Sequence, residues 1–403
     1  METEELYQKS LAYLRKFCEE IPERCVGSPG NRMATNYFEN EISAIGWDTE
    51  KQEFDAIDWE DGGAILYSGN SYFDVFVSPY SLGCDVAAPL VRASSITELS
   101  RLDIKRKVLL LYGEIAKEQL MPKNFVFYNP EEHQQIISLL ERGKPEAIIC
   151  ATERNAALAG GVYPFPLIED GDFDIPSVYM TEYEGRKLLN YVGKTVALTS
   201  RSKRIPGKGY NIIARKGQPS NERIVITAHI DAKKGTPGAI DNASGVVVLL
   251  LLAKLLVDYK GDKLIEIVAF NGEDYYAVPG QMLYITKNQD HFDEILLNIN
   301  IDGAGYKEGE SVYSFYGLPE ELEIKASEEM SKFDGITKGV QWSQGDHSIF
   351  TQKGRPAIAI SSKWFTENID SQDITHTPKD SIEIVDCNKV VEIAEALNLF
   401  IRK

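Results

Sequence analysis

Apolar and polar positions follow two kinds of pattern along the chain, and the clearest example runs from residue 224 to residue 257. Residues 224–228 form an unbroken, β-branched apolar run, which is typical of a strand buried on both faces. A polar segment with proline and glycine follows. Residues 243–257 are then apolar enough for a buried helix, but too few to cross a membrane. This pattern predicts one strand, loop and helix of a parallel sheet.

The same patterns predict the other elements. Apolar residues at helical spacing predict an N-terminal helix at 4–21 and a second helix whose apolar stripe ends before Gly46. Further strands are expected at 64–68, 107–112, 147–150, 210–215, 264–270, 295–301 and 357–361, and further helices at 130–142, 320–333 and 386–402. The predicted fold class is therefore α/β, with a mostly parallel central sheet that has helices on both faces.

A change of pattern divides the chain into two domains. Residues 1–57 and 206–403 alternate apolar strands with helices, whereas residues 58–205 contain short strands and one helix. We therefore expect an α/β domain that is interrupted by an inserted β-rich domain. The Tyr- and Pro-rich loop at 160–173 of the insertion fits a lid and a plain surface loop equally well.

Composition narrows the classes of function. The 403 residues include 61 acidic and 43 basic side chains, and the formal charge of −18 argues against nucleic acid or an anionic membrane as a partner. Five scattered cysteines predict free thiols. The acidic, polar N-terminal residues and the lack of a long apolar run predict a cytoplasmic protein without a signal peptide or transmembrane segment. The sequence makes no prediction of the oligomeric state.

Histidine and acidic residues follow the predicted strands. Parallel strands bring their carboxyl ends to one edge of a sheet, so these residues are expected to meet there. They are His229, Asp231 and Asp241 after the first strand, Glu273, Asp274 and Asp302 after the next two, and His376 after the last. One histidine beside two aspartates also fits a hydrogen-bonded turn. The whole group, however, would be repulsive without a cation, and divalent metals accept these ligands.

The segments AHID, GAIDNASG, AFNGED, NINID, GDHSIF and ITHTPKD, in that order, resemble the signature blocks of the co-catalytic dizinc aminopeptidases of the aminopeptidase Y and glutamate carboxypeptidase superfamily. This resemblance covers about residues 212–403 and implies a zinc exopeptidase-like catalytic domain. In the insertion, DIKRKVLLLYG, PEAIICA and DIPSVYMTEYEGRKLL resemble the blocks of a protease-associated domain.

The resemblance implies a metal-binding role for five side chains. His229 and Asp302 would bind one Zn²⁺, Asp274 and His376 would bind a second, and Asp241 would bridge both. Co²⁺ or Mn²⁺ are alternative metals. The family usually has glutamate where this chain has Asp274, so one ligand arm is shorter here.

The resemblance also implies roles for residues beside the ligands. Glu273 would be the general base, and Asp231 would accept the second ring N–H of His229 and so fix its tautomer. The peptide bond between Asp241 and Asn242 is expected to be cis. His347, in GDHSIF, is expected near the site without binding metal, and the segment CVGSPGN (residues 25–31) fits a loop or the rim of the site. His133 and His291 are expected at the surface.

The implied function is that of a metallo-exopeptidase, an aminopeptidase that removes N-terminal residues from peptides with metal-activated water. No GxSxG, Walker, GxGxxG or HExxH motif suggests another chemistry. Three alternatives stay open. A glutaminyl cyclase usually has tryptophan where this chain has Thr375, a carboxypeptidase for acidic side chains would need an arginine-lined pocket, and a binding protein on a dead peptidase scaffold would have lost its ligands. Many dizinc relatives have tyrosine at the position of Thr375, so the oxyanion donor is unassigned.

Overall fold

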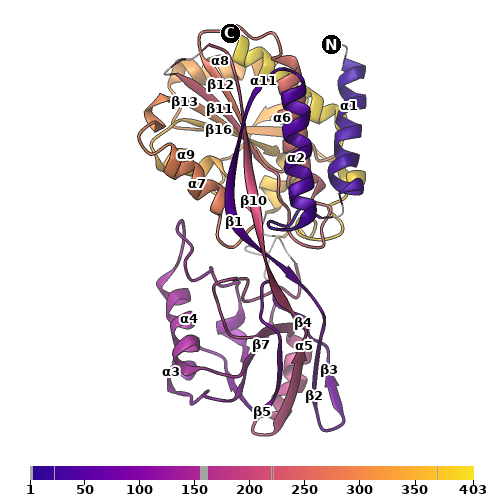
Figure 1. Ribbon diagram of the computed structural model, residues 1–403, viewed down its shortest axis with the longest axis vertical. Coiled ribbons are helices and arrows are strands. Elements are labelled where there is room, and N and C mark those ends of the chain that lie inside the picture. Colours follow the sequence, from indigo (N-terminus) through magenta and orange to yellow (C-terminus); the bar gives the residue numbers. More distant parts are fainter. Residues whose placement is uncertain (1–2, 22, 155–161, 219, 221, 370) are drawn as a thin grey trace. The chain divides into compact units, whose positions relative to one another are not determined.

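The structure is a computed structural model that describes residues 3–21, 23–154, 162–218, 220, 222–369 and 371–403 (Figure 1). The chain forms two compact units. The first consists of Met1–Ala56 and Lys208–Lys403, and the second of Ile57–Gly207. The chain leaves the first unit within β1 (Asp48–Glu60) and returns to it within β10 (Lys203–Lys216).

The first unit is built on an eight-stranded sheet with the order β1-β10-β12-β11-β13-β16-β14-β15. The other strands are β11 (Arg223–His229), β12 (Leu264–Phe270), β13 (Ile295–Ile301), β14 (Ser311–Tyr316), β15 (Ile336–Lys338) and β16 (Ala357–Ser362). β12, β11, β13 and β16 are parallel neighbours, whereas β10 and β14 pair antiparallel with β12 and β16. The predicted mostly parallel α/β sheet is therefore confirmed.

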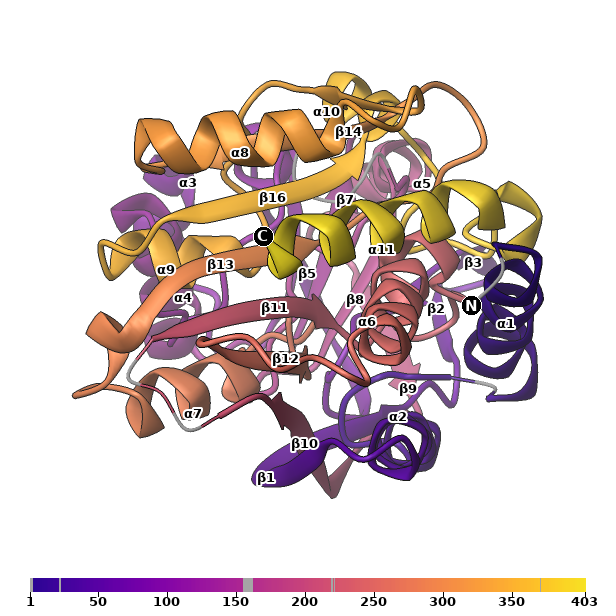
Figure 2. The same ribbon diagram turned by 90° about the horizontal axis from the view of Figure 1, so that it is seen from above.

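Helices cover both faces of this sheet, because its central strands are apolar on both sides. In Figure 1, α1, α2 and α6 lie on one side of the strands and α7 and α9 on the other, and Figure 2 shows α11 beside α6. The helices of the unit are α1 (Thr3–Arg15), α2 (Pro29–Ala44), α6 (Ser244–Leu255), α7 (Pro279–Lys287), α8 (Glu320–Met330), α9 (His347–Gln352), α10 (Lys363–Asn368) and α11 (Cys387–Arg402). The predicted N-terminal, second and C-terminal helices are confirmed.

Each face has its own core. Ile226 of β11 belongs to a large aliphatic cluster with α1, α2, α6 and α11. On β12, Phe270 packs edge-to-face on Tyr284 of α7, which in turn contacts Phe350 of α9. α6 is buried along nearly its whole length, as its uninterrupted apolar sequence predicts. These two cores hold the carboxyl ends of the central strands in fixed positions.

The second unit contains an eight-stranded sheet with the order β3-β2-β9-β5-β6-β7-β8-β4, in which β5, β6, β7 and β8 are parallel neighbours. The strands are β2 (Ala64–Ser68), β3 (Ser71–Phe73), β4 (Phe76–Val77), β5 (Cys84–Ala93), β6 (Val108–Tyr112), β7 (Ala147–Thr152), β8 (Ser177–Thr181) and β9 (Thr195–Ser200). The helices are α3 (Ile96–Arg101), α4 (Glu131–Gly143) and α5 (Glu182–Leu188). The assignment of this unit to a protease-associated domain stays a prediction.

The structure corrects two expectations about the second unit. The prediction that His133 lies at the surface was wrong, because the ring is buried on the apolar face of α4 and Nδ1 accepts a hydrogen bond from the backbone N–H of Met121 at 3.1 Å. In the loop at 160–173, residues 160 and 161 lie outside the described residues. Phe165, Leu167 and Phe173 of this loop pack into the core of their own unit, so this part is not a plain surface loop.

All five cysteines are free, as predicted. Within the described ranges, no helix combines the length and the apolar character that a membrane span requires.

Candidate metal centre

The strand order explains why residues distant in sequence meet. β11 lies between β12 and β13, and His229 is its last residue, in register with Phe270 at the end of β12. Glu273 and Asp274 follow β12 within four residues, and Asp302 directly follows β13. The side chains therefore gather at the carboxyl edge of the parallel sheet, which is where open α/β sheets form their sites.

Asp241 lies between two histidines. Its Oδ1 is 3.1 Å from Nε2 of His229, and its Oδ2 is 3.1 Å from Nε2 of His376. Each histidine has a second carboxylate neighbour, Asp302 at 3.6 Å for His229 and Asp274 at 3.0 Å for His376. The five predicted ligands thus form two half-sites that share one carboxylate.

The charges of this cluster are strongly coupled. Burial favours the neutral imidazole of His229, but Asp302, Asp231 and Asp241 together raise its pKa well above the ordinary value. The pKa of His376 is raised in the same way, against burial, by Asp274 and Asp241. Burial opposes ionisation of Asp241, yet the two histidines lower the pKa of this carboxyl group. Positive charge at the two Nε2 positions is therefore favourable, whether a proton or a metal carries it.

The donor set fits bound zinc. Nδ1 of His229 and Oδ2 of Asp274 are buried polar atoms that make no hydrogen bond within the described structure. Ligand atoms of His229, Asp241 and Asp274 all lie within 4.8 Å of one another. Imidazole nitrogens and carboxylate oxygens are ligands that Zn²⁺ accepts, and burial without hydrogen-bond partners is unfavourable unless something else satisfies these atoms.

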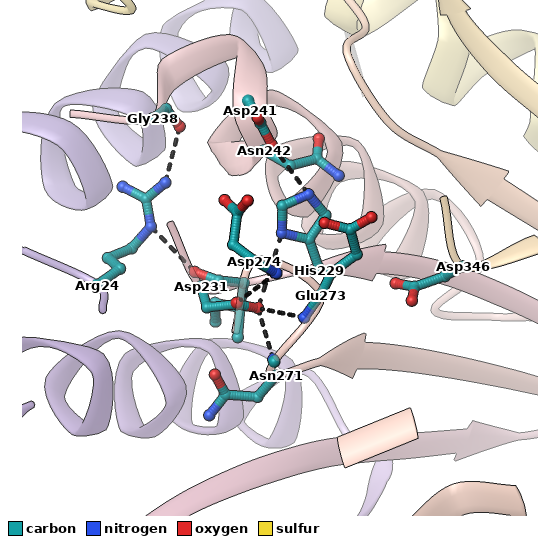
Figure 3. Close-up of polar contacts among 12 residues, drawn as sticks. Arg24, His229, Asp231, Gly238, Asp241, Asn242, Asn271, Glu273, Asp274 and Asp346 are labelled. Atoms are coloured by element: carbon teal, nitrogen blue, oxygen red, sulfur yellow. Dashed lines mark hydrogen bonds and ion pairs between the residues drawn. The ribbon is translucent and has the colours of Figure 1, made fainter. Parts of the chain in front are cut away.

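Asp231 supports the loop that carries Glu273 and Asp274 (Figure 3). Its Oδ1 accepts hydrogen bonds from the backbone N–H groups of Gly272 at 2.7 Å and Glu273 at 3.3 Å, and its Oδ2 accepts one from Asp274 at 3.0 Å. Oδ1 is 3.7 Å from Nδ1 of His229, which is longer than a hydrogen bond. Asp231 thus faces the expected ring nitrogen, but its hydrogen bonds go to the neighbouring loop.

Glu273 is half-buried beside the cluster. Burial raises the pKa of its carboxyl group well above the ordinary value; His229 opposes this effect, and the like charges of Asp274, Asp302 and Asp346 add to it. A carboxyl group with a raised pKa is a stronger proton acceptor once it is ionised, which is the property that a general base needs.

Other expectations near the site have clear outcomes. The peptide bond between Asp241 and Asn242 is cis, as predicted. The exposed His291 contacts Glu294 at 2.8 Å, which confirms that it is a surface residue. His347 is buried, its Nε2 is 3.1 Å from the carbonyl oxygen of Trp342, and burial lowers the pKa of its ring to about 4.

Sequence reasoning missed four polar residues around the cluster. Asn31, in the segment CVGSPGN, exchanges amide hydrogen bonds of 2.8 and 2.9 Å with Asn271, next to the loop of Glu273. The buried Asp346 accepts a hydrogen bond from Gln281 at 2.8 Å. The remaining two, Arg24 and Asp380, contact the backbone that carries Asp241. Asp346 and Asp380 lie in the GDHSIF and ITHTPKD segments, which was the one available signal for them.

The fold and the cluster define an α/β unit with a histidine and carboxylate cluster at the edge of its sheet, and sequence comparison finds a family that this part of the chain resembles. Residues 211–401 match the family described as Peptidase family M28.

Individual proteins are also similar to the chain. "Probable lipoprotein aminopeptidase LpqL" of Mycobacterium tuberculosis is 26% identical over 292 residues, which are 69% of this chain and 54% of that protein. "Aminopeptidase YwaD" of Bacillus subtilis is 25% identical over 232 residues, 54% of this chain and 49% of that protein. The chain thus spans about half the length of these curated relatives.

A solved structure extends the likeness to the fold of the chain. The structure of BSAP, described as a zinc aminopeptidase from Bacillus subtilis, superposes with a TM-score of 0.75 at 19% identity, and covers 98% of this chain and 94% of that one.

Proposed function

We propose that this protein is a zinc-dependent aminopeptidase that binds two metal ions. The observation that carries the proposal is the position of Asp241, whose two carboxylate oxygens each face the Nε2 of a different histidine at 3.1 Å. A carboxylate shared in this way suits two cations. The names of the similar proteins, aminopeptidases and in one case a zinc aminopeptidase, support the same activity.

His229 and Asp302 would hold one Zn²⁺, His376 and Asp274 the other, and Asp241 both. When bound, the two ions would polarise the scissile carbonyl and increase the acidity of water. Co²⁺ or Mn²⁺ would fit the same oxygen and nitrogen ligands.

Glu273 would accept a proton on its carboxylate from the attacking water and then donate it to the leaving amine. Asp231 would hold the loop of Glu273 and Asp274 in place through its three backbone hydrogen bonds.

Aminoacyl p-nitroanilides with free and acetylated amines test the activity. We expect the metal-loaded protein to hydrolyse the free-amine substrates and to leave the acetylated ones intact. Equal hydrolysis of both forms would contradict an aminopeptidase. A peptide with N-terminal glutamine tests the glutaminyl cyclase alternative, because cyclisation releases ammonia without shortening the peptide. Thr375, which hydrogen-bonds to Gln372, replaces the tryptophan usual in cyclases, so no cyclisation is expected.

Two adjacent variants separate proton transfer from metal binding. Glu273→Gln keeps the shape of the side chain but accepts no proton, so we expect wild-type metal content and a kcat lower by about 10²- to 10⁴-fold. Asp274→Ala should lower the occupancy of one metal position, and excess metal should restore part of the activity. Metal loss in Glu273→Gln, together with two retained ions in Asp274→Ala, would reverse this assignment.

A further inference from the structure

Asp380 joins the two loops that carry the shared carboxylate and the second histidine. It lies four residues after His376, and its side chain is fully buried. Its Oδ1 accepts a hydrogen bond from the backbone N–H of Ile240 at 2.7 Å, and its Oδ2 accepts one from the N–H of Asp241 at 3.1 Å. Both oxygens of this buried carboxylate are therefore used to hold the backbone of the proposed bridging residue.

Further contacts connect the same two loops. The backbone N–H of Ala239 donates to the carbonyl oxygen of Asp380 at 3.2 Å. The hydroxyl of Thr236 donates to the carbonyl oxygen of Thr377 at 2.8 Å and accepts from the N–H of Gly238 at 3.1 Å. Movement of one loop therefore displaces the other, and with it one of the two histidines.

Arg24 binds carbonyl groups of the loop that leads to Asp241 (Figure 3). Its guanidinium donates to the carbonyl oxygens of Pro237 and Gly238, both at 2.7 Å, and to that of Ile230, beside His229, at 3.0 Å. Gly238 has a φ of +60°, and a Cβ there would lie 2.7 Å from Nη2 of Arg24. Glycine is required here because it allows both the left-handed backbone and the approach of the guanidinium.

The charged side chains of Arg24 and Asp380 both lie in the protein interior, where an ionised group is less stable than in water. The exposed fraction of Arg24 is 2%, and that of Asp380 is 0%. Removal of a carboxylate and a guanidinium from water is costly unless hydrogen bonds satisfy them. Here backbone groups of residues 237–241 do so, together with the carbonyl oxygens of Phe17 and Ile230. The guanidinium of Arg24 binds the carbonyl groups of Pro237 and Gly238, and the carboxylate of Asp380 binds the backbone N–H groups of Ile240 and Asp241.

We propose that Asp380 and Arg24 are positioning residues that fix the bridging carboxylate of Asp241 and so set the affinity of both metal positions together. The proposal rests on the proposed function only through the role of Asp241. Neither residue touches the proposed ligand atoms by its own side chain, so their effect would pass through the backbone of residues 237–241.

Titration of the metal-free full chain with Co²⁺, followed by visible absorption, tests the proposal. Asp380→Asn has the same shape but loses one of its two acceptor oxygens. We expect both Co²⁺ affinities to fall together by about 10- to 100-fold, which is the usual effect of losing a partner of a metal ligand. Asp274→Ala, by contrast, should weaken mainly one position.

Glu329→Gln is the matched control, because Glu329 is a buried carboxylate of the same unit that pairs with Lys332 and is absent from the metal cluster. It should leave both affinities unchanged. If Asp380→Asn does not fold, Thr236→Val is titrated with Co²⁺ in its place. Both Co²⁺ affinities should then fall together, but by less than in Asp380→Asn. Folded variants with both affinities within twofold of wild type would overturn this proposal alone. A wild-type protein that binds no Co²⁺ would overturn the proposed function as well.

Discussion

Replacement of Asp231 by alanine should destabilise the loop beside the metal cluster by a predictable amount. The wild-type carboxylate accepts hydrogen bonds from three backbone N–H groups, at 2.7, 3.0 and 3.3 Å. A hydrogen bond to a charged group contributes about 1.5–3 kcal/mol, and the two shorter bonds are the stronger ones. Alanine also removes a buried charge, which offsets part of this loss. We expect the free energy of unfolding of the metal-free protein to fall by about 3–5 kcal/mol.

Urea unfolding in the presence of EDTA measures this change, and amide hydrogen exchange locates it. Exchange should accelerate at Gly272, Glu273 and Asp274, whose N–H groups lose their acceptor. Because Glu273 is displaced, kcat of the metal-loaded variant should also decrease. Asp293→Ala is the control, since the side chain of Asp293 is fully exposed and no measurable change is expected. Unaltered exchange at the three amides, with a stability loss below about 1 kcal/mol, would refute the reasoning.

Three further predictions follow from single contacts. Because burial holds the pKa of His347 at about 4, below the unfolded value of about 6.5, the unfolded state binds the proton first as the pH falls. The wild type should therefore lose about 3 kcal/mol of stability relative to His347→Leu between pH 7 and pH 4, measured by urea unfolding of metal-free protein, and parallel pH profiles would contradict this. Gly245→Ala should destabilise the protein in thermal unfolding although alanine favours helices, because its Cβ would lie 2.4 Å from Oδ1 of Asn242 and 2.7 Å from the carbonyl oxygen of Ile301; an increased Tm would be the contrary result. The Asn-Ala-Ser sequon at Asn242 should stay unglycosylated after secretion from a eukaryotic cell, because this side chain is buried and donates to Ile301 at 2.8 Å; added glycan in the intact mass would disprove it.

The sequence predicted those parts of the structure that have a repeating pattern. The β-branched run at 224–228 and the apolar runs at 264–270 and 295–301 are strands because both faces of the sheet are covered, and the ends of these strands bring His229, Asp274 and Asp302 together. Asp241 and His376 were candidates because they follow predicted strands, but their places in the cluster came from the family resemblance, since they lie in loops whose paths no periodicity determines.

Two of the four residues that sequence reasoning missed, Arg24 and Asp380, act through backbone groups. Arg24 donates to carbonyl oxygens more than 200 positions away, and Asp380 accepts from amides about 140 positions away. Such contacts leave no pattern in the sequence, because the partner residue can be of any type. His133 was misjudged for a related reason: its acidic neighbours in sequence point to solvent, whereas its own ring fills a position on the buried face of α4.

The number of zinc ions that the wild-type chain binds tests the central claim most directly. The purified full chain is stripped with a chelator, reloaded with Zn²⁺, separated from free metal by gel filtration and measured for zinc and protein. The shared position of Asp241 between His229 and His376 predicts two ions per chain. One ion or none per chain would contradict the dizinc site.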